Sequence, residues 1–290
     1  MRLALALSGE TPTARLLADF DHIGLVRSEY LFRDAQLYPD PENARHVLYD
    51  YLMAVCSVSA GRPVWFRTLE VNTREANTLR GVEEIIWAEK APMMGLRGIR
   101  RSMKHPASLE AELEVIGEVS STHPNLGIVA PFVTDADEFA WFRERVEKHL
   151  GVDAQVASMV ETPAAVLTLE SILRVPASHV IVGTNDLSSL LLAKGRTSIA
   201  VTDTSLALAK ALVLVRDATA KFGVTMAVAG YLTDGLIASA EHVGADYAVV
   251  HYSDLTRLYG PRYADLPEAD HVRSVKRKTQ AAIAALEPRR

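Results

Sequence analysis

A repeated alternation constrains the fold more than any other feature of this sequence. Short, almost uninterrupted apolar runs recur along the chain, and most are followed by a longer segment of helical periodicity. Such runs are typical of strands buried on both faces, as in parallel sheets, because a strand with one solvent face alternates apolar and polar residues. We predict eight strands: Arg2–Ser8, His22–Arg27, Pro63–Thr68, Leu126–Phe132, Gln155–Glu161, His179–Gly183, Val224–Ala229 and Asp246–His251.

Amphipathic helices are predicted between these strands. The clearest helical patterns cover Asp135–Leu150, Thr204–Phe222 and Thr233–Val243, with Leu266–Leu286 as a closing helix. Gly151, Gly223 and Gly244 lie near the ends of such patterns, where a C-terminal glycine cap is expected. The interval from Leu69 to Asn125 is long for one crossover, and we expect additional helices and a loop there.

Strand and helix alternating eight times predict an α/β fold, a (β/α)8 TIM barrel with right-handed crossovers. The 290 residues would suit either two ordinary domains or one barrel of roughly 250 residues. No Pro/Ser-rich linker or break in composition appears, which favours a single domain over residues 1–290. A doubly wound sheet is the alternative, but the first strand is not followed by Gly-x-Gly-x-x-Gly and the chain lacks a phosphate-binding loop motif.

Composition excludes several broad classes of function. With 31 basic and 36 acidic residues the net charge is −5, which disfavours nucleic-acid binding. Cys56 has no second cysteine with which to form an internal disulfide, which is natural in a reducing cytoplasm. No apolar stretch reaches about 18 residues, and the apolar start fits a buried strand better than a signal peptide. We therefore expect a cytoplasmic protein that binds neither nucleic acid nor membrane.

Polar residues that close the predicted strands form the candidate site. In a TIM barrel the active site lies at the carboxyl ends of the strands. A charge there is costly unless it is paired, metal-bound or engaged by a ligand. The alternative for any single residue is a loop-facing salt bridge, but the shared position favours a site. The residues are Arg27, Arg67, Glu161, Asn185, Asp186 and His251.

Glu161 and Asp186 follow successive predicted strands, so their carboxylates could meet across adjacent strand ends. Two carboxylates with no Cys and few His nearby favour a hard cation such as Mg²⁺ or Mn²⁺. Without a cation, their proximity would raise the pKa of one of them. Water and substrate oxygens would complete the coordination.

Arginines form a second set that suits a small, multiply anionic substrate, because guanidinium groups bind carboxylate and phosphate oxygens in bidentate fashion. A solvated basic loop is the alternative interpretation, and it applies better to Arg100 and Arg101. The members of the set are Arg27, Arg67, Arg97 and Arg196.

Several other chemistries are disfavoured. No predicted strand contains or ends in a lysine, so a Schiff-base nucleophile is absent. Cys56 is expected to be a small buried apolar residue, and the nine histidines show no zinc-site spacing. Ser188 and Ser189 lack an adjacent histidine, which argues against a nucleophilic triad. Met93 and Met94 could form an adaptable protein contact.

Five motifs in order resemble the C-terminal barrel of the PEP-utilising enzymes, the family of enzyme I of the sugar phosphotransferase system, pyruvate phosphate dikinase and PEP synthase. The motifs span almost the whole chain, which makes the resemblance specific. They are IGLVRSEYLF (Ile23–Phe32), FRTL (Phe66–Leu69), GLRGIR (Gly95–Arg100), MVETPAA (Met159–Ala165) and GTNDL (Gly183–Leu187).

The resemblance implies a role for each matching residue. Glu161 and Asp186 match the residues that bind Mg²⁺ in the family. Asn185 matches a further phosphate contact, Arg196 matches another arginine of the site, and the family barrel also implies a homodimer. The residues that match the groups holding the phosphate and the nascent enolate are Arg27, Arg67 and Arg97.

Departures from the family pattern concern proton transfer. Where the family has Cys-Gly-Glu, whose thiol protonates or deprotonates C3 of the enolate, this chain has Ala229-Gly230-Tyr231. The Gly-Gly pair and lysine expected after Arg67 are also absent, and His251 replaces a small hydroxyl residue. His251 has a suitable pKa for acid/base work, and Tyr231 is a second candidate. The alternative is that each packs or hydrogen-bonds in the barrel mouth.

We therefore expect a stand-alone Mg²⁺-dependent transferase or lyase that acts on PEP, pyruvate or a related 2-oxo acid through an enolate. Mg²⁺ and the arginines Arg67 and Arg97 would stabilise the developing charge. Because 290 residues hold the barrel alone, phosphoryl transfer would need a separate phosphohistidine carrier protein. The alternatives are a metal-dependent C–C lyase or aldolase on a 2-oxo acid, and a non-catalytic PEP-binding regulatory subunit.

Overall fold

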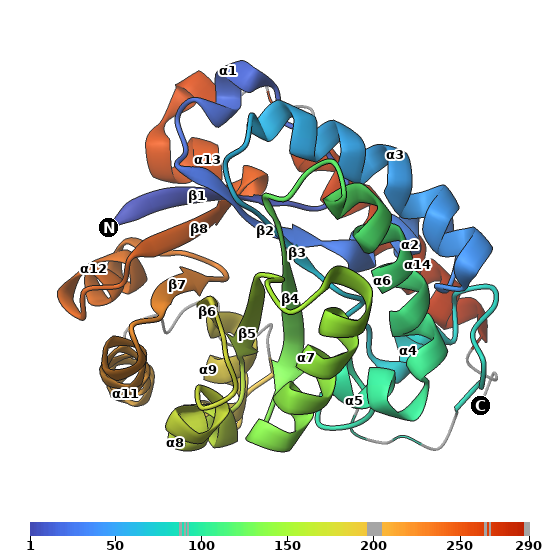
Figure 1. The fold of residues 1–290 in the computed structure, drawn as a ribbon. Coiled ribbons are helices and arrows are strands. Elements are labelled where there is room, and N and C mark those ends of the chain that lie inside the picture. The colour runs from blue at the N-terminus through green and yellow to red at the C-terminus, as the bar shows by residue number, and fades with distance from the viewer. Residues whose placement is uncertain are drawn as a thin grey trace.

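Eight parallel strands close into a barrel in chain order, β1 to β8, with β8 pairing back onto β1 (Figure 1). The computed structural model describes residues 1–86, 89, 91, 93–195, 205–263, 266 and 268–286. The predicted TIM barrel is confirmed, and each observed strand agrees with its predicted range to within about a residue at either end. The strands are β1 (Arg2–Leu7), β2 (His22–Arg27), β3 (Val64–Arg67), β4 (Leu126–Val133), β5 (Val156–Val160), β6 (His179–Gly183), β7 (Thr225–Ala229) and β8 (Tyr247–His251).

Alternation along each strand divides the core into two layers. Ala157 and Met159 of β5 belong to a cluster inside the barrel, whereas Val156 and Val160 face the surrounding helices. Five of the eleven buried members of the inner cluster are alanine, and Trp65 is the largest member. Both sides of the strands are thus buried, which explains the nearly continuous apolar runs in the sequence.

Helices surround the barrel and end at chemically recognisable caps. Asp135 accepts a hydrogen bond from the Glu138 amide at the start of α7, and Gly223 ends α11 in the left-handed conformation, at φ +66°. The helices are α1 (Ala14–Leu17), α2 (Ser28–Ala35), α3 (Pro41–Ser59), α4 (Thr73–Ala76), α5 (Gly98–Lys104), α6 (Pro106–Ser120), α7 (Ala136–Leu150), α8 (Pro163–Ile172), α9 (Thr184–Leu192), α11 (Leu206–Phe222), α12 (Asp234–His242), α13 (Tyr252–Tyr259), the 3₁₀ turn η1 (Pro261–Tyr263) and α14 (Glu268–Leu286).

The predicted helices are confirmed, and the long interval after β3 does contain additional helices, α4, α5 and α6. The first residue of one predicted helix, Thr204, lies outside the described residues. In the part of the chain that the structure describes, no helix combines the length and apolar character needed to cross a bilayer.

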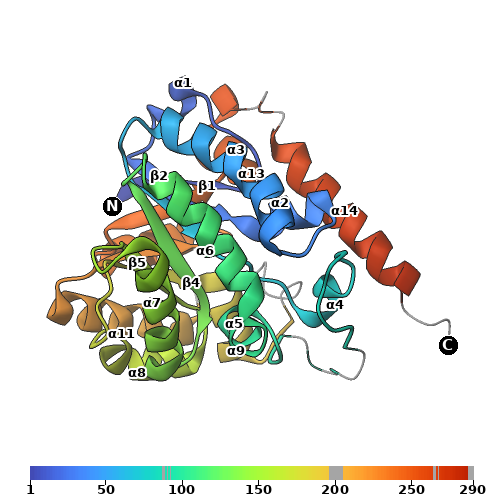
Figure 2. The ribbon, with the colours of Figure 1, turned by 45° about the vertical axis from the view of Figure 1, so that its right-hand side comes forward.

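The last helix, α14, packs beside the first part of the chain. Figure 2 shows it running alongside α2, with α4 nearby. Val272 and Val275 of α14 form a small apolar cluster with Tyr30 of α2, and Arg33 of α2 donates a hydrogen bond to Thr279 at 2.9 Å. This packing brings α14 to the carboxyl ends of β1 and β2, where the candidate site lies.

Candidate functional site

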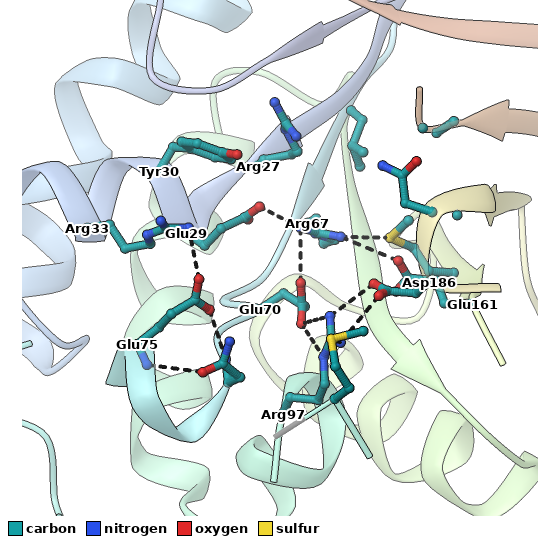
Figure 3. Close-up of a pocket in the computed structure, with 18 residues that line it drawn as sticks. Arg27, Glu29, Tyr30, Arg33, Arg67, Glu70, Glu75, Arg97, Glu161 and Asp186 are labelled. Carbon is teal, nitrogen blue, oxygen red and sulfur yellow. Dashed lines mark hydrogen bonds and ion pairs between the residues drawn. The ribbon is translucent and has the colours of Figure 1, made fainter. Parts of the chain in front are cut away.

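A pocket of about 140 Å³ opens at the carboxyl ends of the strands, the end at which TIM barrels carry their active sites (Figure 3). Strands β2, β3, β5, β6 and β7 or the residues that directly follow them contribute to its wall. Its predicted members are Arg27, Arg67, Arg97, Glu161, Asn185 and Asp186. The structure therefore brings together residues separated by up to 159 positions in the chain, as the strand-end interpretation requires.

Arg67 and Arg97 are each held by several carboxylates (Figure 3). Arg67 Nη2 donates to Glu29 Oε1 at 2.7 Å, and its guanidinium lies 3.5 Å from Glu70 and 3.8 Å from Glu161. Arg97 Nη2 lies 2.6 Å from Glu70 Oε1 and 3.0 Å from Asp186 Oδ2. Glu70 bridges the two arginines. If every carboxyl group is ionised, this cluster has two more negative charges than positive.

Burial and charge shift the pKa values of this cluster. Burial alone would lower the pKa of Arg67, but Glu29, Glu70 and Glu161 raise it above its ordinary value. Burial raises the pKa of Glu161 to about 7; Arg67 opposes that shift and the charge of Asp186 adds to it. Glu161 is therefore a carboxyl group that resists ionisation in the absence of a further cation.

Backbone geometry fixes the Glu161 carboxylate. Its Oε2 accepts a hydrogen bond from the Phe132 amide at 3.1 Å, and Phe132 has the unusual φ of +56° at a register shift between β4 and β5. A positive φ in a bulky residue is strained, and such strain is often found at functional sites. On the other side, a Cβ at position 183 would lie 2.5 Å from Glu161 Oε1, so Gly183 leaves the space in which the carboxylate sits.

Phe132 also positions Arg97. The Arg97 guanidinium lies 4.3 Å from the Phe132 ring centroid, a cation–π contact. Next to Arg97, Gly98 has a φ of +51°, and a Cβ there would approach Pro131 O to 2.9 Å and Phe132 Cβ to 2.7 Å. Glycine is required at this close approach, which explains the Arg-Gly order in the GLRGIR motif.

Arg27 differs from the other two arginines. Its Nε and Nη2 donate to Ser8 Oγ at 2.9 and 2.5 Å, and its guanidinium lies 4.6 Å from the Tyr30 ring centroid. Among the described residues, no carboxylate forms an ion pair with its guanidinium group, in contrast to Arg67 and Arg97. Arg27 thus presents an uncompensated positive charge to the pocket, which suits an anionic ligand.

His251 and Tyr231 do not line this pocket but an adjoining one. His251 Nε2 lies 3.1 Å from Ser8 Oγ and 3.5 Å from Glu10 Oε1, and its Nδ1 lies 2.8 Å from Ser253 Oγ. Burial, and then the charge of Arg27, lower the pKa of His251 below its ordinary value, so it is neutral near pH 7. Tyr231 is 46% exposed, and its ring stacks against Arg257 at 4.6 Å.

The remaining predictions have mixed outcomes. Arg196 lies outside the described residues. Cys56 is buried as expected, and burial raises the pKa of its thiol to about 12. Arg100 is engaged by Glu138 and Thr134, and Arg101 donates to Thr73, so neither belongs to the pocket.

Several site residues escaped the sequence interpretation. Glu29 and Glu70 form the ion pairs that compensate the charges of Arg67 and Arg97. Glu29 stands inside the first motif and Glu70 directly follows the second, but the sequence pattern indicated a role for neither of them. Their charge was visible, but only the fold shows which guanidinium each meets. Glu112 was also missed: its carboxylate accepts hydrogen bonds from the Leu69 amide at 2.9 and 3.2 Å and so anchors the loop after Arg67. Burial raises the pKa of Glu112 to about 8.

The donor set fits a hard divalent cation bound together with substrate. Within the described residues, no three His, Cys, Asp or Glu side chains form a preassembled metal site. The pocket instead offers Glu161 and Asp186, a pair whose mutual repulsion contributes to the raised pKa of Glu161. Two carboxylates plus water and ligand oxygens are a common arrangement for Mg²⁺. The excess negative charge of the surrounding cluster favours the same cation.

Comparison with known proteins places this chain in a family. The model of the family described as "PEP-utilising enzyme, PEP-binding domain" matches residues 9–234, which is most of the chain. The chain belongs to the PEP-utilising enzymes. The matched range includes all five motifs and all the residues that line the first pocket.

Curated relatives share this PEP-binding domain. A probable phosphoenolpyruvate synthase from Archaeoglobus fulgidus is 33% identical over 186 residues, which cover 61% of this chain and 25% of that protein. A phosphoenolpyruvate-protein phosphotransferase from Haloferax volcanii is 32% identical over 191 residues, which cover 61% of this chain and 32% of that protein. The chain thus matches about a quarter to a third of the length of these relatives.

A solved structure shows the same fold as this PEP-binding domain. An HpcH/HpaI aldolase from Desulfitobacterium hafniense superposes with a TM-score of 0.50 and 17% identity, covering 95% of this chain and 92% of that one. At this identity the likeness shows the (β/α)8 barrel alone.

Proposed function

We propose that this PEP-binding barrel is a Mg²⁺-dependent enzyme that binds PEP, pyruvate or a related 2-oxo acid and acts through its enolate. The observation that carries the proposal is one pocket that combines Arg27, which has no carboxylate partner among the described residues, with the buried carboxylate pair Glu161 and Asp186. Arg27 suits an anionic group of the ligand, and the carboxylate pair suits a cation.

The size of the pocket supports a small ligand. Its volume of about 140 Å³ lies below the roughly 300–1,000 Å³ of sites for drug-sized molecules, and polar side chains dominate its wall. A three-carbon acid with a carboxylate and an oxygen or phosphate at C2 suits such a space.

Arg27 would bind the carboxylate or phosphate of the ligand. Arg67 keeps an Nε–H that has no partner within the described part of the chain, and this donor could meet a ligand oxygen. Glu29 and Glu70 hold Arg67 and Arg97 in fixed positions, so the pocket would be preorganised for negative charge that develops on the C2 oxygen.

Glu161 and Asp186 would hold Mg²⁺, or Mn²⁺ in its place. A bound cation would polarise the C2 oxygen and so favour removal of a proton from C3. The raised pKa of Glu161 reflects the cost of a buried negative charge beside Asp186, a cost that a bound cation would reduce.

His251 is the proposed proton carrier. In the family, a cysteine acts at C3 of the enolate, and the matching residue here is Ala229, which lines both this pocket and the adjoining one. His251 lies in the adjoining pocket and is neutral near pH 7, so it can accept a proton. Tyr231 is the weaker candidate because its ring is exposed and stacks on Arg257.

Phosphoryl transfer remains part of the proposal only with a partner that supplies a phosphohistidine. The phosphotransferase relative makes that reaction a natural comparison, but the chain matches only a third of its length.

Calorimetric titration tests ligand binding. Oxalate, a planar dianion shaped like the pyruvate enolate, and PEP should bind in the presence of Mg²⁺ and lose affinity when EDTA replaces it. Arg27→Ala should weaken oxalate binding by about 10- to 100-fold, the range for a lost charge-assisted contact, and Arg27→Lys should weaken it less. Arg174→Ala, at an exposed site remote from the pocket, is the matched control. Metal-independent binding, or equal affinity in Arg27→Ala, would contradict the proposal.

A further inference from the structure

A second cavity of about 150 Å³ adjoins the first. The two cavities share Leu25, Arg27, Asn185, Ala229 and Gly230 as lining residues. Ala229 and Gly230 are the smallest residues on this shared wall, so few side-chain atoms separate a ligand in one cavity from a ligand in the other.

The second cavity contains a histidine held on both ring nitrogens. His251 is 8% exposed, with Ser8 Oγ at 3.1 Å from its Nε2 and Ser253 Oγ at 2.8 Å from its Nδ1. Glu10 Oε1 lies 3.5 Å from Nε2, and Glu10 Oε2 accepts a hydrogen bond from the Ser8 amide at 2.8 Å. These contacts fix the ring in one orientation. A buried, oriented and neutral imidazole inside a cavity is suited to moving a proton.

The charge of the lining favours an anion. Arg27 on one side and Lys276 of α14 on the other are both basic. The acidic residue of the lining, Asp254, lies 3.2 Å from Arg257 and is therefore neutralised locally. In the part of the chain that the structure describes, no carboxylate lies within ion-pair distance of Lys276, which is exposed at this wall.

We propose that the second cavity binds a second substrate, a small carbonyl compound that carries a carboxylate. The inference rests on the proposed function, because an enolate in the first cavity is a carbon nucleophile that can attack a carbon electrophile in the second. Lys276 would attract the carboxylate, since Arg27 is engaged by the first ligand, and the carbonyl group would lie beside Ala229 and face C3 of that ligand.

The atoms balance without a further reagent. His251 takes a proton from C3 of the bound 2-oxo acid, and the electron pair of that C–H bond becomes the enolate. C3 then forms a bond to the carbonyl carbon of the second substrate, and the π electron pair of that carbonyl moves to its oxygen. The imidazolium returns its proton to this oxygen, which gives a hydroxyl group and a neutral His251. Cleavage follows the same steps in reverse.

Binding experiments with glyoxylate and acetaldehyde test this site. With the first cavity saturated by Mg²⁺ and oxalate, NMR saturation transfer should still detect glyoxylate bound to the full chain. At low ionic strength, Lys276→Glu should weaken glyoxylate binding by about tenfold and leave acetaldehyde, which has no carboxylate, unaffected. Lys278→Glu is the matched control, because Lys278 lies on the same helix but pairs with Asp34 and does not line the cavity.

The outcomes separate this inference from the proposed function. Glyoxylate that oxalate displaces fully, or equal glyoxylate affinity in Lys276→Glu and the native protein, would overturn the second site. Absence of Mg²⁺-dependent oxalate binding would overturn the proposed function instead. In that case the effect of Lys276→Glu on glyoxylate alone still decides whether the second cavity binds an anion.

Discussion

Glu161 combines the strongest constraints of any single residue in the pocket. It is buried, it accepts a hydrogen bond from a strained backbone amide, it lies over a glycine and it shares the pocket with Asp186. Burial, with the charge of Asp186, raises its pKa to about 7 from an ordinary value of 4.5. The native state therefore loses stability as the pH rises from about 4.5 to about 7, because the charged form is costly there. A bound cation should recover that loss.

Mg²⁺ should accordingly stabilise the protein more at pH 8 than at pH 6. Below a pKa of about 7 a proton competes with the metal for Glu161, and the apparent affinity for Mg²⁺ should fall by about tenfold for each further pH unit. Thermal unfolding with and without Mg²⁺ at the two pH values measures this difference.

Glu161→Gln is the control for this prediction. Its side-chain oxygen can still accept the hydrogen bond from Phe132, but it carries no charge, so the Mg²⁺ effect should vanish at both pH values. Equal stabilisation at pH 6 and pH 8, or stabilisation that survives in Glu161→Gln, would show that the cation binds elsewhere.

Strand-end position predicted Arg27, Arg67, Glu161 and Asp186 from the sequence, because every parallel strand of a barrel delivers its last residue to the same end. The carboxylate partners of the pocket arginines could not be predicted in the same way. Which carboxylate meets which guanidinium depends on side-chain reach across strands, so Glu29 and Glu70 appeared only with the fold. These pairings matter because, of the three predicted arginines in the pocket, Arg27 alone has no carboxylate partner among the described residues.

At the scale of elements, α14 links the end of the chain to the site. It contacts α2 through Tyr30, Val272 and Val275, and it supplies Lys276 and Val272 to the second cavity. Its helical pattern was predicted from the sequence. Its docking position was not, because amphipathic periodicity gives the direction of an apolar face but does not identify the surface that covers it.

Val275→Ala should lower the free energy of unfolding by about 2 kcal/mol, since it removes two fully buried methyl groups and leaves a small cavity. Urea denaturation measures the change. The matched control is Val213→Ala on α11, where the side chain is 45% exposed and the same substitution should cost less than about 0.5 kcal/mol. Similar losses in the two variants would mean that α14 is not packed against α2 as described.

At the scale of the whole molecule, the two ends of the barrel have different chemistry. The carboxyl end holds the charged pocket, whereas the amino end is closed by aromatic and histidine rings. His179 stacks on Trp65 at 5.1 Å between ring centroids, and Tyr247 meets His22 edge-on at 4.6 Å. Burial, and then the charge of His22, lower the pKa of His179 to about 3. The amino end thus contributes a packed layer of rings, as is typical of the stability face of a TIM barrel.

The free energy of unfolding should fall at acid pH because His179 of this layer is buried in its neutral form. His179 stays neutral in the native state, while the unfolded chain takes up a proton below its ordinary pKa of 6.5. The free energy of unfolding should therefore drop by up to about 1.4 kcal/mol per pH unit from this residue alone, from about pH 6.5 down to about pH 3.

His179→Asn, measured by urea denaturation at pH 7.5, 6.5 and 5.5, should show a shallower fall than the native protein. Asn can preserve the hydrogen bond to Thr225 but cannot titrate. His46→Asn, at an exposed position on α3, serves as the matched control and should leave the slope unchanged. A slope unchanged by His179→Asn would refute this account of the acid sensitivity.

We propose that the pocket converts a bound 2-oxo acid into its enolate, and exchange of the C3 protons with solvent measures this reaction. The purified protein is incubated with Mg²⁺ and pyruvate in D₂O, and the C3 protons are followed by NMR. We predict metal-dependent deuterium incorporation at C3 that falls strongly in Glu161→Gln and in His251→Ala, with Tyr231→Phe close to the native rate. Pyruvate that keeps its C3 protons at the rate of the protein-free solution, with Mg²⁺ present and binding confirmed by calorimetry, would contradict the claim.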